Sequence, residues 1–327
     1  MLNRQSVWSA ILAVPLGVFL ALGAGLATAD EYIGGWQKDY PVIHYGVISV
    51  ETAVDTVKSQ TAFVEYASKE LGVKWKLFTA AEYAGIVNGL AAGQVEVGWL
   101  GASSFASTYM DCKCVEPIAG AMDPYGAMGY NSVLIVKSGS PYQKFEDLKG
   151  KTVARNDPES TSGYLIPTVA WYKMGTPVDK YFNSPLSGGH QQTIVGVLNG
   201  TYEGGFTWTT RNDGFGAIRK MVDKGLLKRD QIRVIWTSKL IPTPPVVIRS
   251  NLPLAMKADL VKLFIRLQER EPKLAEAVAQ GHTLGMKRVY LHAQESVIDF
   301  YHDLGYTAYG ETFLEAGIVH QKMEKAL

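Results

Sequence analysis

Short apolar runs alternate with amphipathic segments along most of the chain. The run VIHYGVIS, residues 42–49, is typical of a buried strand, and residues 51–73 carry apolar side chains at helical spacing. Residues 73–78 alternate apolar and lysine positions as a strand does. Residues 81–94 predict a second helix and residues 95–101 the next strand. This β-α-β-α-β order predicts a parallel sheet with helices on its faces.

The same rhythm recurs in the second half of the chain. We expect strands at 131–136, 202–208 and 232–238, and helices at 188–200 and 212–227. Within residues 145–155 we expect a short helical turn that runs into a strand. Residues 244–253 have the pattern of a chain crossing back, and from Ala255 onward the spacing predicts helix. Two such halves predict two lobes with a ligand cleft between them. We expect residues 30–137 and 247–327 to form the first lobe and residues 138–246 to form the second.

The first 29 residues have the pattern of an export signal. One early base, Arg4, precedes an apolar run without acids that ends in the small residues Ala27 and Ala29. This pattern predicts a signal peptide, residues 1–29, cleaved after Ala29. The alternative is an uncleaved membrane anchor, but Pro15 and several glycines interrupt the run and favour cleavage. No later window approaches the ~20 apolar residues that a membrane span needs.

Length and charge narrow the class of protein. The 327 residues, 47% of them hydrophobic, suffice for one large or two medium domains. The expected cleavage removes one base and no acid, which leaves 31 basic and 31 acidic side chains and a formal net charge of zero. A neutral protein does not bind nucleic acid or an anionic membrane through its overall field. Any anion must therefore bind at a local site.

Both cysteines, Cys112 and Cys114, lie in the segment DCKCVEP. In an oxidising exported compartment they can form a short local disulfide, which adds little stability. They can also form a redox site or a site for a soft ligand. Two thiolates without a nearby histidine or further cysteine make a poor zinc site, so we expect no metal.

Three consecutive hydroxyl side chains, Ser160, Thr161 and Ser162, lie in the segment NDPESTSGYLIP between a predicted strand and a predicted helix. Pro158 favours a turn, so the hydroxyls fall at a helix N-terminus, where backbone N–H groups are unpaired and the helix dipole is positive. Such donors suit a tetrahedral oxyanion, with Gly163 keeping the approach open. The alternative is a capped helix, because Ser and Thr are common caps. The segment does not match the P-loop motif.

The hydroxyl loop resembles the ligand loop of the phosphonate- and phosphite-binding periplasmic proteins that serve ABC transporters. Other segments are similar to that family in order and spacing: YGVISVET, LGVKWKLFTAAEYAGIVNGL, VEVGWLG, GYNSVLIV, GGHQQTIVGVLNG and VIWTSKLIPTPPVV. The similarity covers roughly residues 43–252. It implies an α/β protein with the two-lobed type II periplasmic binding protein fold and a ligand cleft between the lobes. It also implies a periplasmic location and a permease in the inner membrane as partner.

The resemblance also implies which residues hold the phosphorus–oxygen head of the ligand. Three of them are the neighbouring hydroxyl residues Ser160, Thr161 and Ser162. The other three are Tyr83 in the segment EYAGI, Tyr130 in GYNSV and His190 in GGHQQT. We expect the two tyrosines to bring phenolic donors from the first lobe to a ligand on the second, so that closure completes the hydrogen-bond shell. His190 can donate to an oxyanion while neutral. Without the resemblance, a tyrosine is more often a core residue and a lone histidine a neighbour of a helix cap.

The sequence departs from the family at two positions. Members that bind an aminoalkyl phosphonate carry two acids for the ammonium group, where this chain has Thr210 and Pro244. An unpaired ammonium in a closed cleft is unfavourable. The departure predicts a ligand without an amine: phosphite, methylphosphonate, another small phosphonate or phosphate. Trp208 and Thr209, with Thr210, are expected to line that end of the cleft.

Two other functions remain open at this point. An enzyme is disfavoured, because the sequence has no nucleophile elbow, no HExxH and no GxGxxG after a strand, and no cofactor is expected. The alternative is a sensor that presents an oxyanion, for example an arsenic oxyanion held through a cysteine, to a membrane histidine kinase. Cys112 and Cys114 are the residues on which that alternative depends.

Overall fold

The computed structural model describes residues 32–48, 53–80, 82–120, 129–210, 213–278, 288–294, 298, 302, 307–315 and 318–326. The described residues all belong to one unit, Tyr32–Leu327. The expected signal peptide, residues 1–29, lies outside the described residues.

The first lobe is built on a five-stranded sheet with the order β2-β1-β3-β10-β4. Its strands are β1 (Val42–Ile48), β2 (Lys74–Ala80), β3 (Val97–Trp99), β4 (Val115–Gly120) and β10 (Pro245–Arg249). Strand β1 pairs in parallel with β2 and β3, whereas β10 runs antiparallel between β3 and β4. The expectation of parallel pairing within residues 42–101 is therefore confirmed for β1, β2 and β3. Strand β10 comes from late in the chain and makes the complete sheet mixed.

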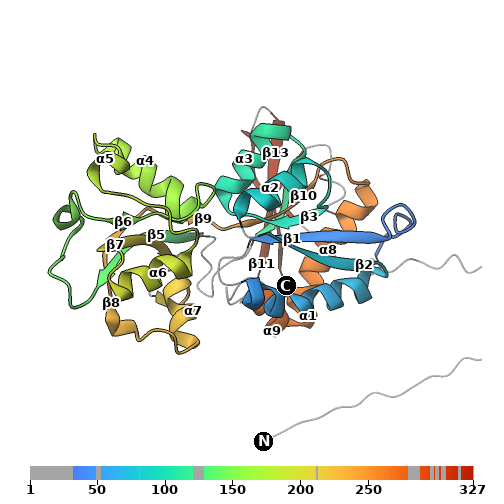
Figure 1. Ribbon diagram of the computed structural model, residues 1–327. Helices are drawn as coiled ribbons and strands as arrows, with labels where there is room; N and C mark the ends of the chain where they lie inside the picture. Colours follow the sequence, from blue (N-terminus) through green and yellow to red (C-terminus); the bar gives the residue numbers. More distant parts are fainter. Residues whose placement is uncertain are drawn as a thin grey trace, which may run out of the picture. The chain divides into compact units, whose positions relative to one another are not determined.

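Helices cover both faces of this first sheet (Figure 1). They are α1 (Ala53–Leu71), α2 (Tyr83–Ala91), α3 (Ala102–Cys112), α8 (Leu254–Arg270) and α9 (Pro272–Val278). Ile43, Tyr45 and Val47 of β1 are buried in one cluster with Phe63 of α1 and Leu263 of α8. The opposite face packs against α2, whose buried side chains lie in a separate cluster. The period of two along β1 thus places one helix layer on each side.

The second lobe is built on a mixed sheet with the order β6-β7-β5-β8, and a short strand, β9, also pairs with β5. Its strands are β5 (Gly129–Lys137), β6 (Val153–Ala154), β7 (Gly204–Thr209), β8 (Ile232–Thr237) and β9 (Ile241–Pro242). Strand β6 is parallel to β7, while β5 is antiparallel to β7, β8 and β9.

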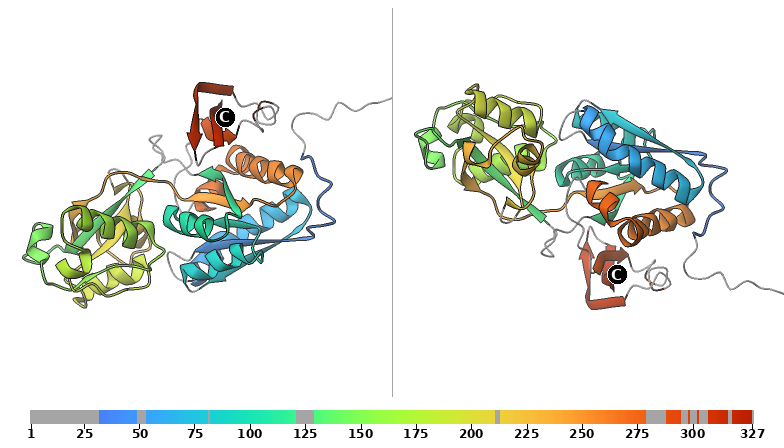
Figure 2. Two further views of the ribbon diagram at one scale, coloured as in Figure 1. Left: turned by 90° about the horizontal axis from the view of Figure 1, so that it is seen from above. Right: turned by 90° about the horizontal axis from the view of Figure 1, so that it is seen from below.

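Helices again lie on both sides of the second sheet (Figures 1 and 2). They are α4 (Ile166–Lys173), α5 (Val178–Tyr181), α6 (His190–Asn199) and α7 (Ala217–Asp223), with a π-helical turn at Thr161–Leu165 and 3₁₀ turns at Phe145–Leu148 and Arg229–Gln231. Val133 and Ile135 of β5 are buried with side chains of α6 and α7. Leu134 and Val136 are buried on the other face with Trp171 of α4.

A third sheet follows the helices α8 and α9. Strands β11 (Arg288–Gln294), β12 (Thr307–Glu315) and β13 (Ile318–Ala326) pair antiparallel in the order β11-β13-β12. The expectation that the chain is helical from Ala255 onward is therefore correct for α8 and α9 and wrong for these strands. Period-two alternation is weak here, so the pattern did not separate strand from helix.

The sequence places the first change of lobe after residue 137. Strand β5 ends at Lys137 and pairs with β7, β8 and β9, so its pairing belongs to the second sheet. Residues 121–128, outside the described part, connect β4 to β5. The return near residue 246 falls within β10 of the first sheet. We propose that the chain changes lobe between the end of β4 and the start of β5 and returns at Thr243–Pro244, between β9 and β10.

Leu263 and Leu254 form a matched pair for testing this packing, because both lie in α8. Leu263 is fully buried in the core of the first lobe, whereas Leu254 is 58% exposed. We expect Leu263→Ala to lower the free energy of unfolding by about 2–5 kcal/mol through lost contacts and a residual cavity. Leu254→Ala should change it by less than about 0.5 kcal/mol. Urea unfolding of both variants checks this, and equal effects would contradict the assignment of α8 to the core.

Candidate ligand-binding site

Side chains from both lobes line one cavity of about 70 Å³. Its polar lining is Tyr83, Tyr130, Ser160, Thr161, Ser162, His190 and Thr243. Its remaining lining is Ile48, Trp99, Leu100, Gly101, Trp208 and Pro244. The structure therefore brings all six ligand residues implied by the sequence to one cavity.

The cavity lies where four helical segments begin. Helix α2 begins at Tyr83, α6 begins at His190, and α3 begins immediately after Gly101. Ser160 is the residue before the π-helical turn that leads into α4. The first N–H groups of a helix have no intrahelical partner, and the helix dipole is positive at this end. Four such ends make the cavity favourable for an anion, although none of the lining residues that the structure describes carries a charged side chain.

The three neighbouring hydroxyl residues are buried, and one of them is the helix cap. The Ser160 hydroxyl accepts a hydrogen bond from the Gly163 N–H at 3.1 Å. The Thr161 hydroxyl oxygen accepts one at 2.8 Å from the Ser103 N–H at the start of α3. The carbonyl of Ser162 accepts one from the Ser132 hydroxyl at 2.6 Å. The capping interpretation and the ligand interpretation are thus compatible, because a single serine serves as the cap.

Gly163 has a different role from the one that the sequence suggested. A Cβ atom added there would lie 2.2–2.5 Å from side-chain atoms of Asn156. Asn156 is fully buried and donates to the Thr193 hydroxyl and the Phe206 carbonyl. Gly163 is therefore needed for close packing of the loop against Asn156, rather than for keeping the approach to the ligand open.

Both tyrosines of the site are protonated donors at neutral pH. Burial raises the pKa of Tyr130 to about 12 and raises that of Tyr83 further. The Ser160 side chain lies beside Tyr83, and the Thr161 and Ser162 side chains lie beside Tyr130; each lowers the pKa of its tyrosine by less than burial raises it. Tyr83 comes from the first lobe as expected. Tyr130 comes from β5 of the second sheet, so its expected origin in the first lobe is wrong.

His190 is held in its neutral form. Its side chain is buried, and burial together with the nearby Lys220 lowers its pKa to about 3. Its Nδ1 lies 3.2 Å from the Thr207 hydroxyl. When that hydroxyl donates to Nδ1, the proton resides on Nε2, and the imidazole becomes a neutral donor.

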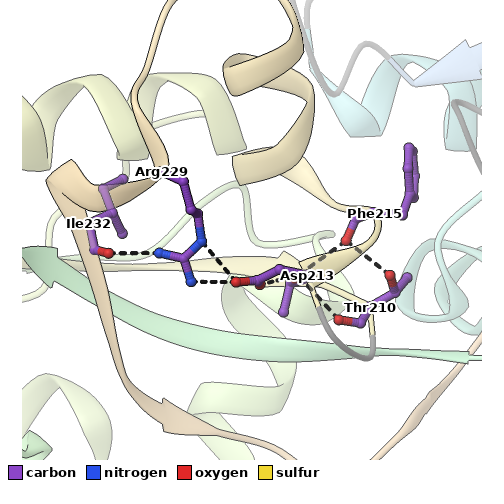
Figure 3. Close-up of polar contacts among 6 residues, drawn as sticks. Thr210, Asp213, Phe215, Arg229 and Ile232 are labelled. Carbon is purple, nitrogen blue, oxygen red and sulfur yellow. Dashed lines mark hydrogen bonds and ion pairs between the residues drawn. The ribbon is translucent and has the colours of Figure 1, made fainter.

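The sequence predicts that Trp208, Thr209 and Thr210 line the end of the cleft that receives the substituent of the ligand, and the structure agrees only in part. Trp208 and Pro244 line the cavity, but Thr209 and Thr210 do not. The Thr210 hydroxyl instead donates to the Phe215 carbonyl at 3.0 Å (Figure 3). The Thr209 hydroxyl oxygen lies 3.1 Å from the same carbonyl oxygen and 2.9 Å from Asp213 Oδ1, and it donates its one proton to this pair of acceptors.

Asp213 is the acid nearest in sequence to this end, and it already has a cationic partner. Both Nε and a terminal nitrogen of Arg229 donate to Asp213 Oδ2, and Arg229 also donates to the Ile232 carbonyl (Figure 3). Asp213 is not among the lining residues of the cavity.

Sequence reasoning missed several lining residues, most of which lie at strand ends. Ile48 ends β1, Trp99 ends β3, and Leu100 and Gly101 follow it. The rule that ligands lie beyond the carboxyl ends of strands in α/β sheets is the signal that would have found them. Thr243 follows the short strand β9, which no apolar pattern indicated.

Direct contacts join the two lobes beside the cavity. The Ser104 hydroxyl donates to the Glu159 carbonyl at 3.0 Å, and the Ser107 hydroxyl donates to the Glu159 carboxylate at 3.2 Å. Burial, with the charges of Asp157 and Asp111, raises the pKa of Glu159. These contacts hold the start of the hydroxyl loop against α3.

Cys112 and Cys114 form a disulfide at the end of α3. Neither is among the residues that line the cavity. Within the described part of the chain, no group of three or more His, Cys, Asp or Glu side chains is placed to hold a metal ion.

Comparison with solved structures defines the class of protein. A binding-protein component of a Pseudomonas aeruginosa ABC phosphonate transporter superimposes with a TM-score of 0.66 at 29% identity, covering 75% of this chain and 80% of that one. The protein, with two sheet-based lobes around one cavity, therefore has the two-lobed fold of periplasmic binding proteins.

Sequence comparison then defines the family. The model of the family described as "ABC transporter, phosphonate, periplasmic substrate-binding protein" matches residues 45–289. The phosphonates-binding periplasmic protein of Escherichia coli K12 is 31% identical over 233 residues, which are 70% of this chain and 67% of the relative. The phosphate-import protein PhnD of Mycolicibacterium smegmatis is 30% identical over 230 residues, 67% of this chain and 70% of the relative. The chain belongs to the phosphonate family of periplasmic substrate-binding proteins of ABC transporters, which are transport proteins rather than enzymes.

A second family model, that of the acetyltransferase (GNAT) domain, matches residues 260–327. This match begins inside α8, where Leu260, Leu263 and Leu267 are buried in the core of the first lobe. Helix α8 thus gives its apolar face to the binding-protein fold, and the rest of the match contains β11, β12 and β13. The sequence interpretation missed this resemblance, since it took the segment as helix.

No helix in the described ranges is both long and apolar enough to cross a membrane.

The buried neutral His190 predicts a pH dependence of stability. Its pKa is about 3 in the folded chain and about 6.5 when exposed, so the unfolded chain binds more protons between these values. Stability should therefore fall as the pH drops below about 6.5, by up to about 1.4 kcal/mol per pH unit from this group. Urea unfolding between pH 4 and 7 measures the slope.

His190→Gln should have a shallower slope than the wild type, because glutamine cannot take up the proton. His302→Gln, at an exposed position, is the control and should keep the wild-type slope. Identical slopes in all three proteins, or an imidazole that titrates near pH 6.5 by NMR, would contradict the neutral buried state of His190.

Proposed function

We propose that this protein captures a small phosphorus oxyanion without an amine group and delivers it to an ABC permease in the inner membrane. Phosphite, methylphosphonate, another small phosphonate and phosphate belong to this ligand class. One observation carries the proposal: the described lining residues of the cavity are several hydroxyl and imidazole donors and apolar side chains, with no charged side chain among these described residues.

Neutral donors are sufficient to hold an oxyanion here. A hydrogen bond to a charged acceptor contributes about 1.5–3 kcal/mol. A helix N-terminus contributes about 0.3–1 kcal/mol. The hydroxyls of Ser160, Thr161 and Ser162 lie beside two phenols that are protonated at neutral pH. The hydrogen bonds formed when the ligand replaces these mutual contacts therefore account for most of the affinity.

The exclusion of an amine follows from the apolar part of the lining. An ammonium group beside Trp99, Trp208 and Pro244 would lose its hydration without gaining a carboxylate from the lining residues that the structure describes. Asp213 does not compensate, because it is bound to Arg229 and lies outside the lining.

The proposal includes no catalytic step. His190 Nδ1 has the Thr207 hydroxyl as its neighbour rather than a carboxylate that could orient it as a general base. None of the described residues of the acetyltransferase match, which spans residues 260–327, lines the cavity. The sensor alternative loses support, because Cys112 and Cys114 are bonded to each other and do not line the cavity.

Ligand titration tests this proposal. We expect methylphosphonate to bind at least about tenfold more tightly than 2-aminoethylphosphonate, because an unpaired buried ammonium costs more than one factor of ten. Simultaneous Ser160→Ala, Thr161→Ala and Ser162→Ala substitution should abolish calorimetric binding. Ser59→Ala, at an exposed position of α1, is the control and should bind normally. Tighter binding of the amine, or normal binding by the triple variant, would refute the proposal.

Export is part of the same proposal. A permease of the inner membrane receives ligand from the periplasm, so residues 1–29 should act as a signal peptide cleaved after Ala29. N-terminal sequencing of the protein recovered from the periplasm should therefore begin at Asp30. A chain that retains Met1 in the membrane fraction would show an uncleaved anchor instead.

A further inference from the structure

Thr243 is a polar residue at the cavity whose function neither the fold nor its neighbours explain. It lies between β9 and β10, which belong to different sheets. On one side, Ile241 of β9 pairs with Tyr130. On the other side, the Pro244 carbonyl accepts a hydrogen bond from Trp99 Nε1 at 3.1 Å. Both flanks of Thr243 are therefore fixed against cavity-lining residues.

The hydroxyl of Thr243 is buried without a hydrogen-bond partner among the described residues. The side chain is 9% exposed. More than about 90% of buried polar groups in proteins are paired, so an unpaired one calls for an explanation. Of the described side chains with such an orphaned atom, Thr243 is the one that lines the cavity. A bound ligand is the partner that would satisfy this hydroxyl.

The position of Thr243 indicates which part of the ligand it meets. The other polar lining residues are at helix starts and on the hydroxyl loop, where they hold oxygens of the phosphorus head. Thr243 instead lies next to Pro244, which together with Trp99 belongs to the apolar part of the lining. When the polar part of the cavity lining holds three oxygens of a tetrahedral phosphorus, the fourth group on the phosphorus points away from that part and toward the apolar part of the lining.

We propose that Thr243 hydrogen-bonds this fourth group and selects ligands in which it carries a hydroxyl. The hydroxyl is either bound directly to phosphorus, as in phosphate, or to the adjacent carbon, as in hydroxymethylphosphonate. A threonine hydroxyl donates one hydrogen bond and accepts others, as does a ligand hydroxyl. A ligand with hydrogen or methyl in this place leaves Thr243 unpaired, and sites that bind a hydroxyl discriminate strongly against such analogues. This inference rests on the proposed function and narrows its ligand class.

Two matched ligand pairs and two substitutions test the inference. The pairs are hydroxymethylphosphonate with ethylphosphonate, and phosphate with phosphite, and each pair differs in the hydroxyl. Thr243→Val keeps the shape of the side chain and removes the hydroxyl, while Thr243→Ser keeps the hydroxyl. Calorimetric dissociation constants give, for each protein, the preference for the hydroxyl-bearing member of a pair. Thermal unfolding confirms that both variants are folded.

We expect the wild type and Thr243→Ser to prefer the hydroxyl-bearing member of at least one pair by about tenfold or more. Thr243→Val should lose about tenfold of that preference, mainly through weaker binding of the hydroxyl-bearing ligand. The pair that responds shows whether the hydroxyl is on phosphorus or on carbon. An unchanged preference in both pairs, with all four ligands still bound, overturns the inference and leaves the proposed function intact. Binding of none of the four ligands to the wild type overturns both.

Discussion

The meeting of several helix N-termini is the constraint on which the proposed binding site depends. The starts of α2, α3 and α6, and the turn before α4, all lie at one cavity. These ends supply positive potential without a lysine or arginine, whose burial would itself be unfavourable. Hydroxyl side chains placed on the same ends extend the donors to the position of a ligand. In the proposed function, an anion in this cavity would therefore be held by neutral groups whose geometry the fold fixes in advance.

The fold explains why these ends meet. Each lobe is a sheet covered by helices on both faces, and helices that follow strands begin near the strand ends. Tyr130 and Thr243 lie where the chain passes between the two sheets, and β9 pairs beside Tyr130. The contacts of Ser103, Ser104 and Ser107 with the hydroxyl loop add direct bonds between the lobes. The site is thus formed by connections as much as by the lobes themselves.

Much of this arrangement could be predicted from the sequence, because it depends on local signals. The strand and helix rhythm of residues 42–101, the helix start at Ser160 and the cluster of six site residues needed only apolar periodicity, turn chemistry and a family resemblance. The lobe to which Tyr130 belongs could not be predicted, since it depends on pairing with strands about 75 to 110 residues further along the chain. The same holds for the insertion of β10, and for Thr209 and Thr210, whose hydroxyls bond Phe215 instead of lining the cavity.

A crystal structure of the chain with methylphosphonate measures most directly whether neutral donors hold the anion. The account predicts phosphonate oxygens within hydrogen-bond distance of the Ser160, Thr161 and Ser162 hydroxyls and of the Tyr83 phenol. It also predicts the methyl group against Trp99 or Pro244, with no lysine or arginine in contact with the phosphonate. A phosphonate bound outside this cavity, or one paired with a basic side chain, would contradict it.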